Sequence, residues 1–289
     1  LPLNDTGNYA LYSNQQVDPE LIEQVNVNLG TTDVDSPTAA ATGSTVNYRT
    51  RKPYEKMGVN VIGSVGEFDF KRLFANAEWR LTPSWVINAG VMGEQNSSFG
   101  FSLAPRLMFN WHVASGHTLR AGVSRSFRPP SVFETSSNVR YNYNNLLLQV
   151  TSLSRGNVQP ESMLARELGY LATMPHWGAT LDVRLFHEQL SGMVQRQQYA
   201  LPVGISVLPS YPADFYNGRD ISIRGLEYQF NWKPWPSAQL GFNQAYTRIS
   251  LAQPEVEPET VYAAPVLASK LFFTQEFAAD MALTVMHQQ

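Results

Sequence analysis

Residues 231–242 read NWKPWPSAQLGF, with two tryptophans and two prolines between two segments of alternating polarity. The apolar residues before this turn share one parity: Leu226, Tyr228, Phe230 and Trp232. Those after it also share one parity: Ala238, Leu240, Phe242 and Tyr246. A period of two predicts β-strands with one apolar face. Such neighbouring strands occur in a sandwich, where that face meets a core, and in a membrane barrel, where it meets lipid.

The tryptophans favour the membrane barrel. All six flank short turns: Trp79, Trp85, Trp111, Trp177, Trp232 and Trp235. Tryptophan prefers the boundary between hydrocarbon and headgroups, so tryptophans at one end of successive strands indicate an aromatic girdle. The alternative is that aromatic residues near turns cap the core of a soluble protein. The position of all six tryptophans beside short turns makes this alternative weaker.

Composition narrows the classes further. The chain has 289 residues with 24 acidic and 21 basic side chains, so no broad basic face suggests nucleic acid as a partner. No window offers the roughly 20 consecutive apolar residues of a membrane-spanning helix, whereas a barrel strand needs only about ten alternating ones. Cysteine is absent, which excludes disulfides and thiolate metal sites and fits an oxidising compartment.

The alternation from residue 57 onward predicts eleven strands. They are expected at 57–65, 69–80, 84–94, 101–112, 118–127, 163–173, 178–190, 221–232, 237–249, 265–274 and 280–288. Short turns carry the tryptophans, whereas longer polar loops are expected at 127–162, 191–220 and 250–264, the asymmetry of outer-membrane barrels. Charges on the second face, as in TLDVRLF (residues 180–186), predict a polar interior. The predicted fold is all-β, part of an antiparallel transmembrane β-barrel.

Residues 1–54 differ from this pattern. PELIEQVNVNLG (residues 19–30) predicts a short helical turn that leads into a strand, and a second short strand is expected before a linker at Lys52 and Pro53. The predicted organisation is a small α/β unit over residues 1–54 and a partial barrel over residues 55–289.

Catalytic and metal-binding patterns are not found in the sequence. The five histidines lack metal-ligand spacing, and His187 with Glu188 begins an HExxH motif that has no second histidine. No GxSxG elbow occurs, which disfavours an outer-membrane serine hydrolase. We therefore expect no enzyme activity, no catalytic residue, no metal site and no cofactor.

One loop segment stands out as a candidate ligand contact. RYNYNN (residues 140–145) interleaves aromatic, amide and cationic groups that suit a polar, partly aromatic ligand. The candidate residues are Arg140, Tyr141, Tyr143 and Asn145. An ordinary solvated loop is the alternative.

Three further segments resemble the TonB-dependent outer-membrane receptors. They are SRSFRPPSVFE (residues 124–134), GNVQPESMLARELGY (residues 156–170) and FYNGRDISIRGLEYQF (residues 215–230), in the family's order and spacing. PELIEQVNVNLG and GSTVNYRTRKP (residues 43–53) are similar to the end of the family's plug domain. The positions that match family motifs are Gly30, Gly43, Asn47, Pro53, Arg128, Pro130, Asn157, Pro160, Glu161 and Gly225.

This resemblance implies a plugged barrel of about 22 strands in the outer membrane of a Gram-negative bacterium. Residues 1–54 would be the C-terminal part of the plug. The protein would be a carrier that takes up a scarce ligand, such as a ferric siderophore, another metal chelate or cobalamin, with energy from the TonB complex. Its other partner would be outer-membrane lipid. The alternatives are a passive porin-like or adhesive barrel, which has no reason to carry a plug segment, and a soluble binding sandwich.

Departures from the family pattern add two expectations. The family commonly has arginine before the glycine matching Gly30, where this chain has Leu29, so Arg49 or Arg51 is the candidate partner for barrel residues Glu167 and Glu227. Simple solvation of those carboxylates in the lumen is the alternative. Eleven strands also predict an incomplete barrel. A large middle block of the barrel is expected to be missing at a junction near residues 72–75, and the start of the plug, its TonB-contacting box and the terminal strands are expected to be missing as well.

Overall fold

The computed structural model describes residues 22–29, 44–50, 57–251, 265–278 and 281–289. The chain separates into two units, Leu1–Glu55 and Lys56–Gln289, which are described individually.

In the first unit, two strands pair antiparallel. β1 (Ile22–Leu29) and β2 (Ser44–Thr50) form a two-stranded sheet in which Val25 is opposite Tyr48. The strand predicted within residues 19–30 is β1, which begins at Ile22. Residues 19–21, on which the helical turn before it was predicted, lie outside the described part. The identity of this unit as a plug segment stays a prediction.

In the described residues of the second unit there are one sheet of thirteen strands, one short helix and one 3-10 turn. The strands are β3 (Gly58–Val65), β4 (Lys71–Thr82), β5 (Trp85–Asn96), β6 (Gly100–Ala114), β7 (His117–Arg128), β8 (Asn138–Tyr143), β9 (Leu146–Leu153), β10 (Glu161–Met174), β11 (Ala179–Gln198), β12 (Ala213–Trp232), β13 (Ala238–Leu251), β14 (Leu267–Ala278) and β15 (Met281–Gln288). The helix is α1 (Val132–Ser136) and the 3-10 turn is η2 (Pro175–Trp177).

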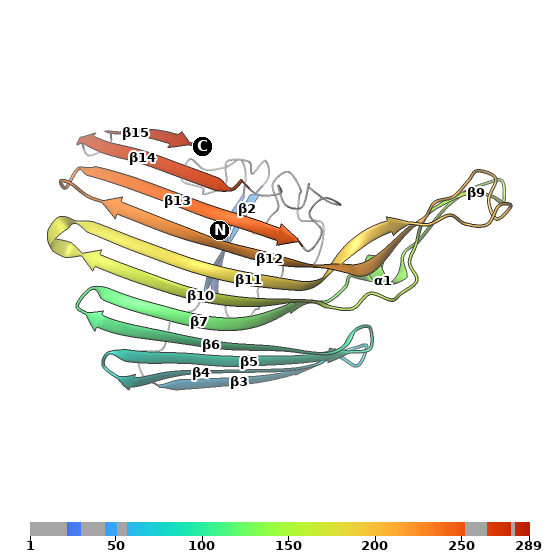
Figure 1. The fold of residues 1–289 in the computed structure, drawn as a ribbon, viewed down its shortest axis with the longest axis horizontal. Coiled ribbons are helices and arrows are strands. Elements are labelled where there is room, and N and C mark those ends of the chain that lie inside the picture. Colours follow the sequence, from blue (N-terminus) through green and yellow to red (C-terminus); the bar gives the residue numbers. More distant parts are fainter. Residues whose placement is uncertain (1–21, 30–43, 51–56, 252–264, 279–280) are drawn as a thin grey trace. The chain divides into compact units, whose positions relative to one another are not determined.

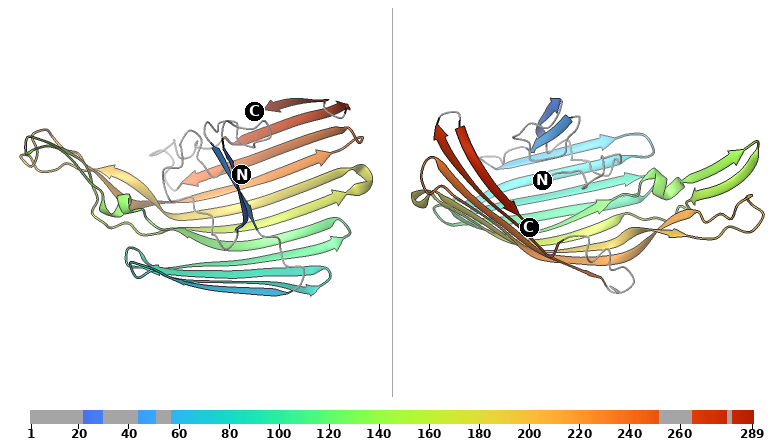
Figure 2. Two further views of the ribbon diagram at one scale, coloured as in Figure 1. Left: turned by 180° about the vertical axis from the view of Figure 1, so that it is seen from behind. Right: turned by 90° about the horizontal axis from the view of Figure 1, so that it is seen from above.

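Eleven of these strands run side by side as an antiparallel meander. Their order is β15-β14-β13-β12-β11-β10-β7-β6-β5-β4-β3 (Figure 1). They correspond one to one to the eleven predicted strands, which confirms the all-β, antiparallel prediction. Seen along its edge, the sheet of this unit is strongly curved (Figure 2).

Two of the predicted loops contain regular structure instead. Most of 191–220 belongs to β11 and β12, which extend beyond the neighbouring strands and leave only residues 199–212 as their connection. The segment 127–162 holds α1 and the β8–β9 hairpin. Hydrogen bonds from distant segments stabilise both regions, and local sequence patterns do not reveal such bonds.

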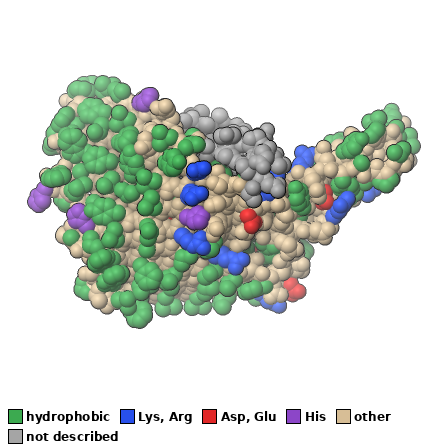
Figure 3. All heavy atoms as spheres, in the orientation of Figure 1, with side chains coloured by type: hydrophobic (Ala, Val, Ile, Leu, Met, Phe, Trp, Pro, Cys, Tyr) green, Lys and Arg blue, Asp and Glu red, His purple; other side chains and the backbone are tan. Residues whose placement is uncertain are grey.

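The two faces of the meander differ in polarity as the alternation predicts. The convex face carries exposed apolar side chains such as Leu168, Leu185 and Tyr246, which are 60%, 51% and 45% exposed. Apolar side chains dominate the part of this face nearest the short turns (Figure 3). The opposite, concave face carries charged residues that include Glu167, Arg184 and Glu227. Among the described residues, no helix is long and apolar enough to cross a membrane.

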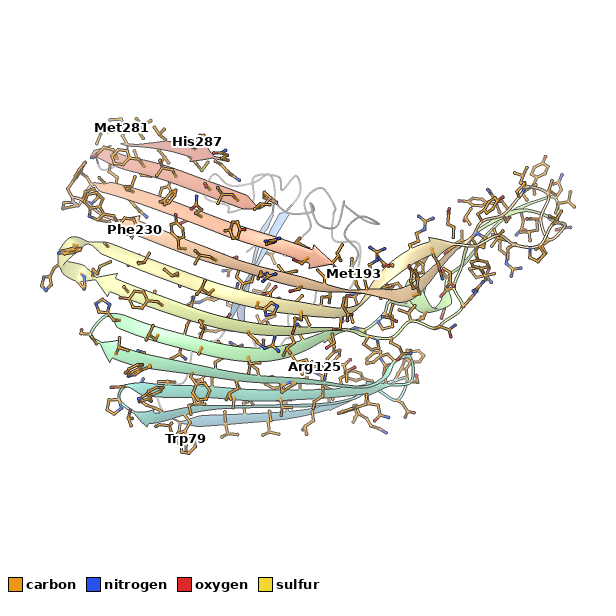
Figure 4. All side chains as sticks on the ribbon, viewed as in Figure 1. Trp79, Arg125, Met193, Phe230, Met281 and His287 are labelled. Carbon is orange, nitrogen blue, oxygen red and sulfur yellow. The ribbon has the colours of Figure 1, made fainter. Side chains whose placement is uncertain are left out.

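The six tryptophans lie at the short-turn end of the sheet. Trp85 on β5 stacks on Trp111 of β6 with ring centroids 5.2 Å apart. Trp79 marks this end on β4 (Figure 4), and the other three flank the β10–β11 and β12–β13 turns. Their common end is what an aromatic girdle requires.

Candidate functional site

The concave face carries an ion cluster that spans three strands. Arg184 on β11 lies opposite Glu227 of β12, and Glu167 of β10 is on the same face. The Arg184 guanidinium donates to Glu167 at 3.0 Å through Nε and to Glu227 at 3.4 Å through Nη1. It also donates to Glu188 at 3.4 Å and lies over the Phe186 ring, 4.9 Å from its centroid. One arginine therefore neutralises part of the charge of three carboxylates.

A second ion pair continues this polar face toward the short turns. Arg120 on β7 donates to Asp182 of β11 at 2.7 Å across the intervening strand β10. Gly169 of β10 is opposite Arg120 on β7 and opposite Arg184 on β11, and its missing side chain leaves room for the Arg120 stem. The concave face is thus lined by paired charges, which suits a water-filled lumen.

The structure describes three of the four residues predicted to form a contact between plug and barrel, namely Glu167, Glu227 and Arg49. Glu167 and Glu227 both have an arginine partner inside the barrel sheet, namely Arg184. Arg49 lies 3.7 Å from Glu23 within the first unit. Arg51 lies outside the described residues. A role for Arg49 or Arg51 toward the barrel carboxylates stays a prediction.

A tight corner follows the long-loop end of β7. Arg128 donates to Glu161 at 2.7 Å and to Glu134 at 3.0 Å, which ties the ends of β7 and β10 to α1. Ser131 caps α1: its hydroxyl accepts the Glu134 N–H, and its own N–H donates to the Glu134 carboxylate at 2.7 Å. The Glu161 carboxylate also accepts the Val194 N–H of β11 at 2.6 Å. The carboxylates of Glu134 and Glu161 therefore connect β7, α1, β10 and β11.

The electrostatics of this corner keep it ionised. Partial burial works to raise the pKa of the Glu134 carboxyl, but hydrogen bonds from Arg128 and from the Ser131 backbone outweigh it and lower that pKa. Glu134 therefore holds its negative charge, and the bidentate contact with Arg128, throughout the neutral range. Such a corner orients the hairpin that follows it.

Beyond the corner, β8 and β9 project from the sheet together with residues 199–212 (Figure 1). The connection 199–212 is held to β9 by main-chain bonds from Val207 to Leu147 and from Leu208 to Leu148, both 2.9 Å. The Val150 N–H donates to the Ser210 hydroxyl at 2.9 Å. We call this unit of α1, β8, β9 and residues 199–212 the platform.

Several buried residues lie at the base of the platform. Asp214 is 3% exposed and accepts the Arg155 backbone N–H at 3.0 Å. The Arg155 guanidinium lies 4.1 Å from the centroid of the Tyr199 ring, whose hydroxyl donates to the Leu153 carbonyl at 3.1 Å. Val150 and Val158 in the same region of the chain are also buried. These contacts give the platform a defined tertiary structure of its own.

The predicted ligand contacts lie together on the platform. Arg140, Tyr141 and Tyr143 belong to β8, and the Arg140 Nε donates to Asn138 at 2.8 Å. Tyr141 and Tyr143 are 57% and 65% exposed. Asn145 is the second residue of the β8–β9 turn, where Asn144 and Asn145 have φ of 46° and 63°. Two left-handed residues make a type I′ hairpin turn, a conformation that asparagine tolerates. Their role in binding stays a prediction.

The residues at family-motif positions have identifiable places. Arg128 and Glu161 form the corner, Pro130 precedes the α1 cap, and Asn157 and Pro160 lie in the segment that enters β10. Gly225 lies on β12 beside Phe186 and the Tyr246 carbonyl. Asn47 is a β2 residue opposite Asn26. The positions outside the described residues are Gly30, Gly43 and Pro53.

No group of three or more metal-ligating side chains occurs in the described ranges. His187 lies 3.0 Å from the Ser222 hydroxyl on the convex face.

A family model described as TonB dependent receptor-like, beta-barrel matches residues 2–276. The chain belongs to the TonB-dependent receptor family. The match covers both units, and this family consists of receptors and transporters, which are not a class of enzyme.

Similar proteins agree with this membership. The chain is 24% identical over 148 residues to the ferrienterobactin receptor of Escherichia coli K12, which covers 46% of this chain and 18% of that protein. Its fold is similar to that of the siderophore receptor PirA of Acinetobacter baumannii (TM-score 0.56, 13% identity, 75% of this chain and 32% of that one). It is also similar to a variant of the ferric enterobactin receptor PfeA of Pseudomonas aeruginosa, solved in complex with enterobactin (TM-score 0.59, 15% identity, 76% and 32%). The TonB-dependent receptor chain thus spans about a third of the solved receptors and less of the curated one.

Several residues of the candidate site were not predicted from the sequence. Arg184 was recognised only as a polar-face residue, because its three carboxylate partners follow from the register of β10, β11 and β12. The contacts of Arg155 with Tyr199 and Asp214 join segments about 45 and 60 residues apart. The Asn-Asn pair at 144–145 was the one local signal that could have revealed the hairpin.

Proposed function

We propose that this chain forms part of an outer-membrane receptor that takes up a ferric siderophore with energy from the TonB complex. The observation that carries the proposal is the two-sided sheet of a TonB-dependent receptor, with an apolar convex face and ion pairs on its concave face. An apolar outer surface around a charged interior is the arrangement that a barrel needs to hold a polar passage in a bilayer.

Placement in the outer membrane is supported by the ends of the strands. Tryptophans gather at the short-turn end, and the platform projects from the other end. In outer-membrane barrels, short turns are periplasmic and long connections are extracellular. The platform would then be exposed to ligands that approach from outside the cell.

The siderophore is inferred from relatives and from the chemistry of the platform. The E. coli and P. aeruginosa relatives are named as receptors for ferric enterobactin. A ferric catecholate is aromatic and anionic, and the exposed platform offers the Tyr141 and Tyr143 rings for stacking and, on the same strand, the positive charge of Arg140. The iron is cargo, carried by its chelator, so the protein needs no metal ligands of its own.

The first unit is proposed to be the C-terminal part of the plug. Its paired strands β1 and β2 carry the residues that resemble the end of that domain. In this proposal, ligand binding on the platform is transmitted through the plug to the TonB complex on the periplasmic side.

The double variant Y141A/Y143A tests the ligand site. We expect it to weaken the Kd for ferric enterobactin about tenfold, because two aromatic contacts of roughly 0.5–1.5 kcal/mol each are lost and about 1.4 kcal/mol is a factor of ten. Isothermal titration calorimetry on the detergent-solubilised protein measures this value.

A tyrosine away from the platform provides the control. Tyr246 is 45% exposed on the convex face, so Y246A should bind as tightly as the unchanged protein. If the unchanged protein, Y141A/Y143A and Y246A all bound equally tightly, Tyr141 and Tyr143 would not be part of the ligand site. Binding of a ferric hydroxamate in place of the catecholate would reassign the class of siderophore.

A further inference from the structure

A row of basic side chains crosses the convex face. Arg166 on β10, His187 on β11, Arg224 on β12 and Arg248 on β13 are direct cross-strand neighbours. Arg125 on β7 extends the row, because it lies opposite Leu164, two residues from Arg166. We call these five residues the basic belt. They form a continuous line of blue and purple side chains in Figure 3, and Figure 4 labels Arg125 at its lower end.

The belt has no acidic partner in the described part of the chain. None of the ion pairs found there involves a belt residue. Its hydrogen bonds go to neutral groups, from Arg125 to the Ser162 hydroxyl and from Arg166 to the Gln189 amide oxygen, both at 2.8 Å. The four arginines are exposed. This contrasts with the concave face, where Arg120 and Arg184 are both paired.

The register makes this arrangement costly without a counter-ion. Like charges that lie directly opposite on neighbouring strands destabilise a sheet, and Arg224 faces Arg248 in this way. Within the described parts of β7 and β10–β13, the acid of convex parity that lies nearest to the belt along its strand is Asp220, four residues before Arg224 on β12, and it accepts the Gly192 N–H. Glu188 and Glu227 point to the concave face. A row of four guanidinium groups and an imidazole is suited to phosphate, which arginine binds in a bidentate fashion.

The depth of the belt matches a membrane interface. Arg224 stands eight residues before Trp232 on the same strand, with Leu226, Tyr228 and Phe230 between them on the same face. At about 3.3 Å per residue and a tilt of about 40°, this is about 20 Å across the bilayer, close to the roughly 25 Å apolar band of such barrels. The tryptophans and the belt would then occupy opposite interfaces.

An apolar groove adjoins the belt on its membrane side. It is lined by Leu168, Leu185, Leu226 and Tyr246 below Arg166, His187 and Arg224, and by Leu107 and Phe109 farther along the sheet. Acyl chains fit such a surface, whereas a free phosphate ion makes no use of it. Cations above an apolar groove therefore favour an amphiphile with a phosphorylated headgroup.

We propose that the basic belt binds the phosphate groups of a phosphorylated lipid in the outer leaflet, with an acyl chain in the groove. This inference rests on the membrane placement proposed above and is independent of the siderophore. The lipid would neutralise the opposed arginines and fix the height of the sheet in the membrane.

Native mass spectrometry on protein purified in non-ionic detergent tests the proposal. The probe is an acylated glucosamine disaccharide with two phosphates, compared with its dephosphorylated form and with inorganic phosphate. We expect the unchanged protein to retain only the phosphorylated lipid, and R166Q/R224Q/R248Q to retain at most about a tenth as much. R166K/R224K/R248K should keep most of the binding, because it preserves the charges.

The control R80Q/R196Q/K233Q removes three positive charges away from the belt and should bind as the unchanged protein does. Equal retention by the belt and control variants would overturn the proposal, as would equal binding of the dephosphorylated lipid. If millimolar inorganic phosphate displaced all of the lipid, the ligand of the belt would be a free phosphate anion and the lipid proposal would be wrong. Purification of the unchanged protein without detergent would instead refute the membrane placement, and normal lipid binding without siderophore uptake would refute only the transport proposal.

Discussion

Replacing Gly225 by alanine is expected to destabilise the sheet strongly, whereas the same change at Gly63 should be tolerated. A Cβ at Gly225 would collide with the Tyr246 backbone carbonyl and would lie 2.6 Å from the Phe186 ring. The carbonyl belongs to the β12–β13 ladder and cannot move without breaking it. Overpacking of this kind costs about 1–3 kcal/mol, and a clash with backbone belongs at the upper end.

Gly63 is the matched control for this change. It also lies within a strand, β3, but a Cβ there would have no neighbour within 4 Å. Alanine should be neutral or stabilise by roughly 0.5–1 kcal/mol, because glycine loses more conformational freedom on folding. The unfolding midpoint of the detergent-solubilised proteins, followed by gel mobility, measures both effects. Equal midpoints for G225A and G63A would contradict the packing described around Phe186.

Replacing Arg184 by methionine is expected to have the second large effect. It would leave Glu167, Glu188 and Glu227 close together without their shared cation. Removing one partner of a buried pair costs about 3–5 kcal/mol, and the partial exposure of these groups reduces the expected loss to about 1–3 kcal/mol. Urea unfolding of the solubilised protein measures the difference.

Two further variants separate charge from packing. Arg196 lies on the same strand and is exposed, so R196M should change stability little. Adding E167Q and E227Q to R184M should recover most of the lost stability, since the repulsion disappears with the charges. A triple variant as unstable as R184M would show that the contact of the Arg184 guanidinium with the Phe186 ring matters more than its pairing with the carboxylates.

The meander could be predicted from sequence because its information is local. Alternation with a period of two defined all eleven strands, and TLDVRLF already showed Arg184 on the polar face. The long-loop ends of β11 and β12, residues 191–198 and 213–220, were not predicted as strand. The pairing of these two strands shifts register between Leu190 and Val194, where Gly192 has φ of 70°. A bulge reverses the alternation on which the prediction depends.

The candidate site was predictable only in part. The polar parity of Glu167 and Glu227 placed both on the inner face, and RYNYNN marked the exposed part of the hairpin. Their partners come from long-range contacts, such as those of Ser210 and Asp214 with residues about 60 positions away. The basic belt was missed for the same reason, because its members are scattered over 124 positions and meet only when the strands are in register.

Energised uptake is the most direct measure of the proposed function. Cells that lack their own ferric siderophore receptors and express this protein would be given ferric enterobactin with radiolabelled iron, in strains with and without TonB. We expect iron to accumulate only when the protein and TonB are both present. Equal accumulation without TonB would indicate a passive pore, and no accumulation in either strain, with the protein detected in the outer membrane, would contradict siderophore uptake.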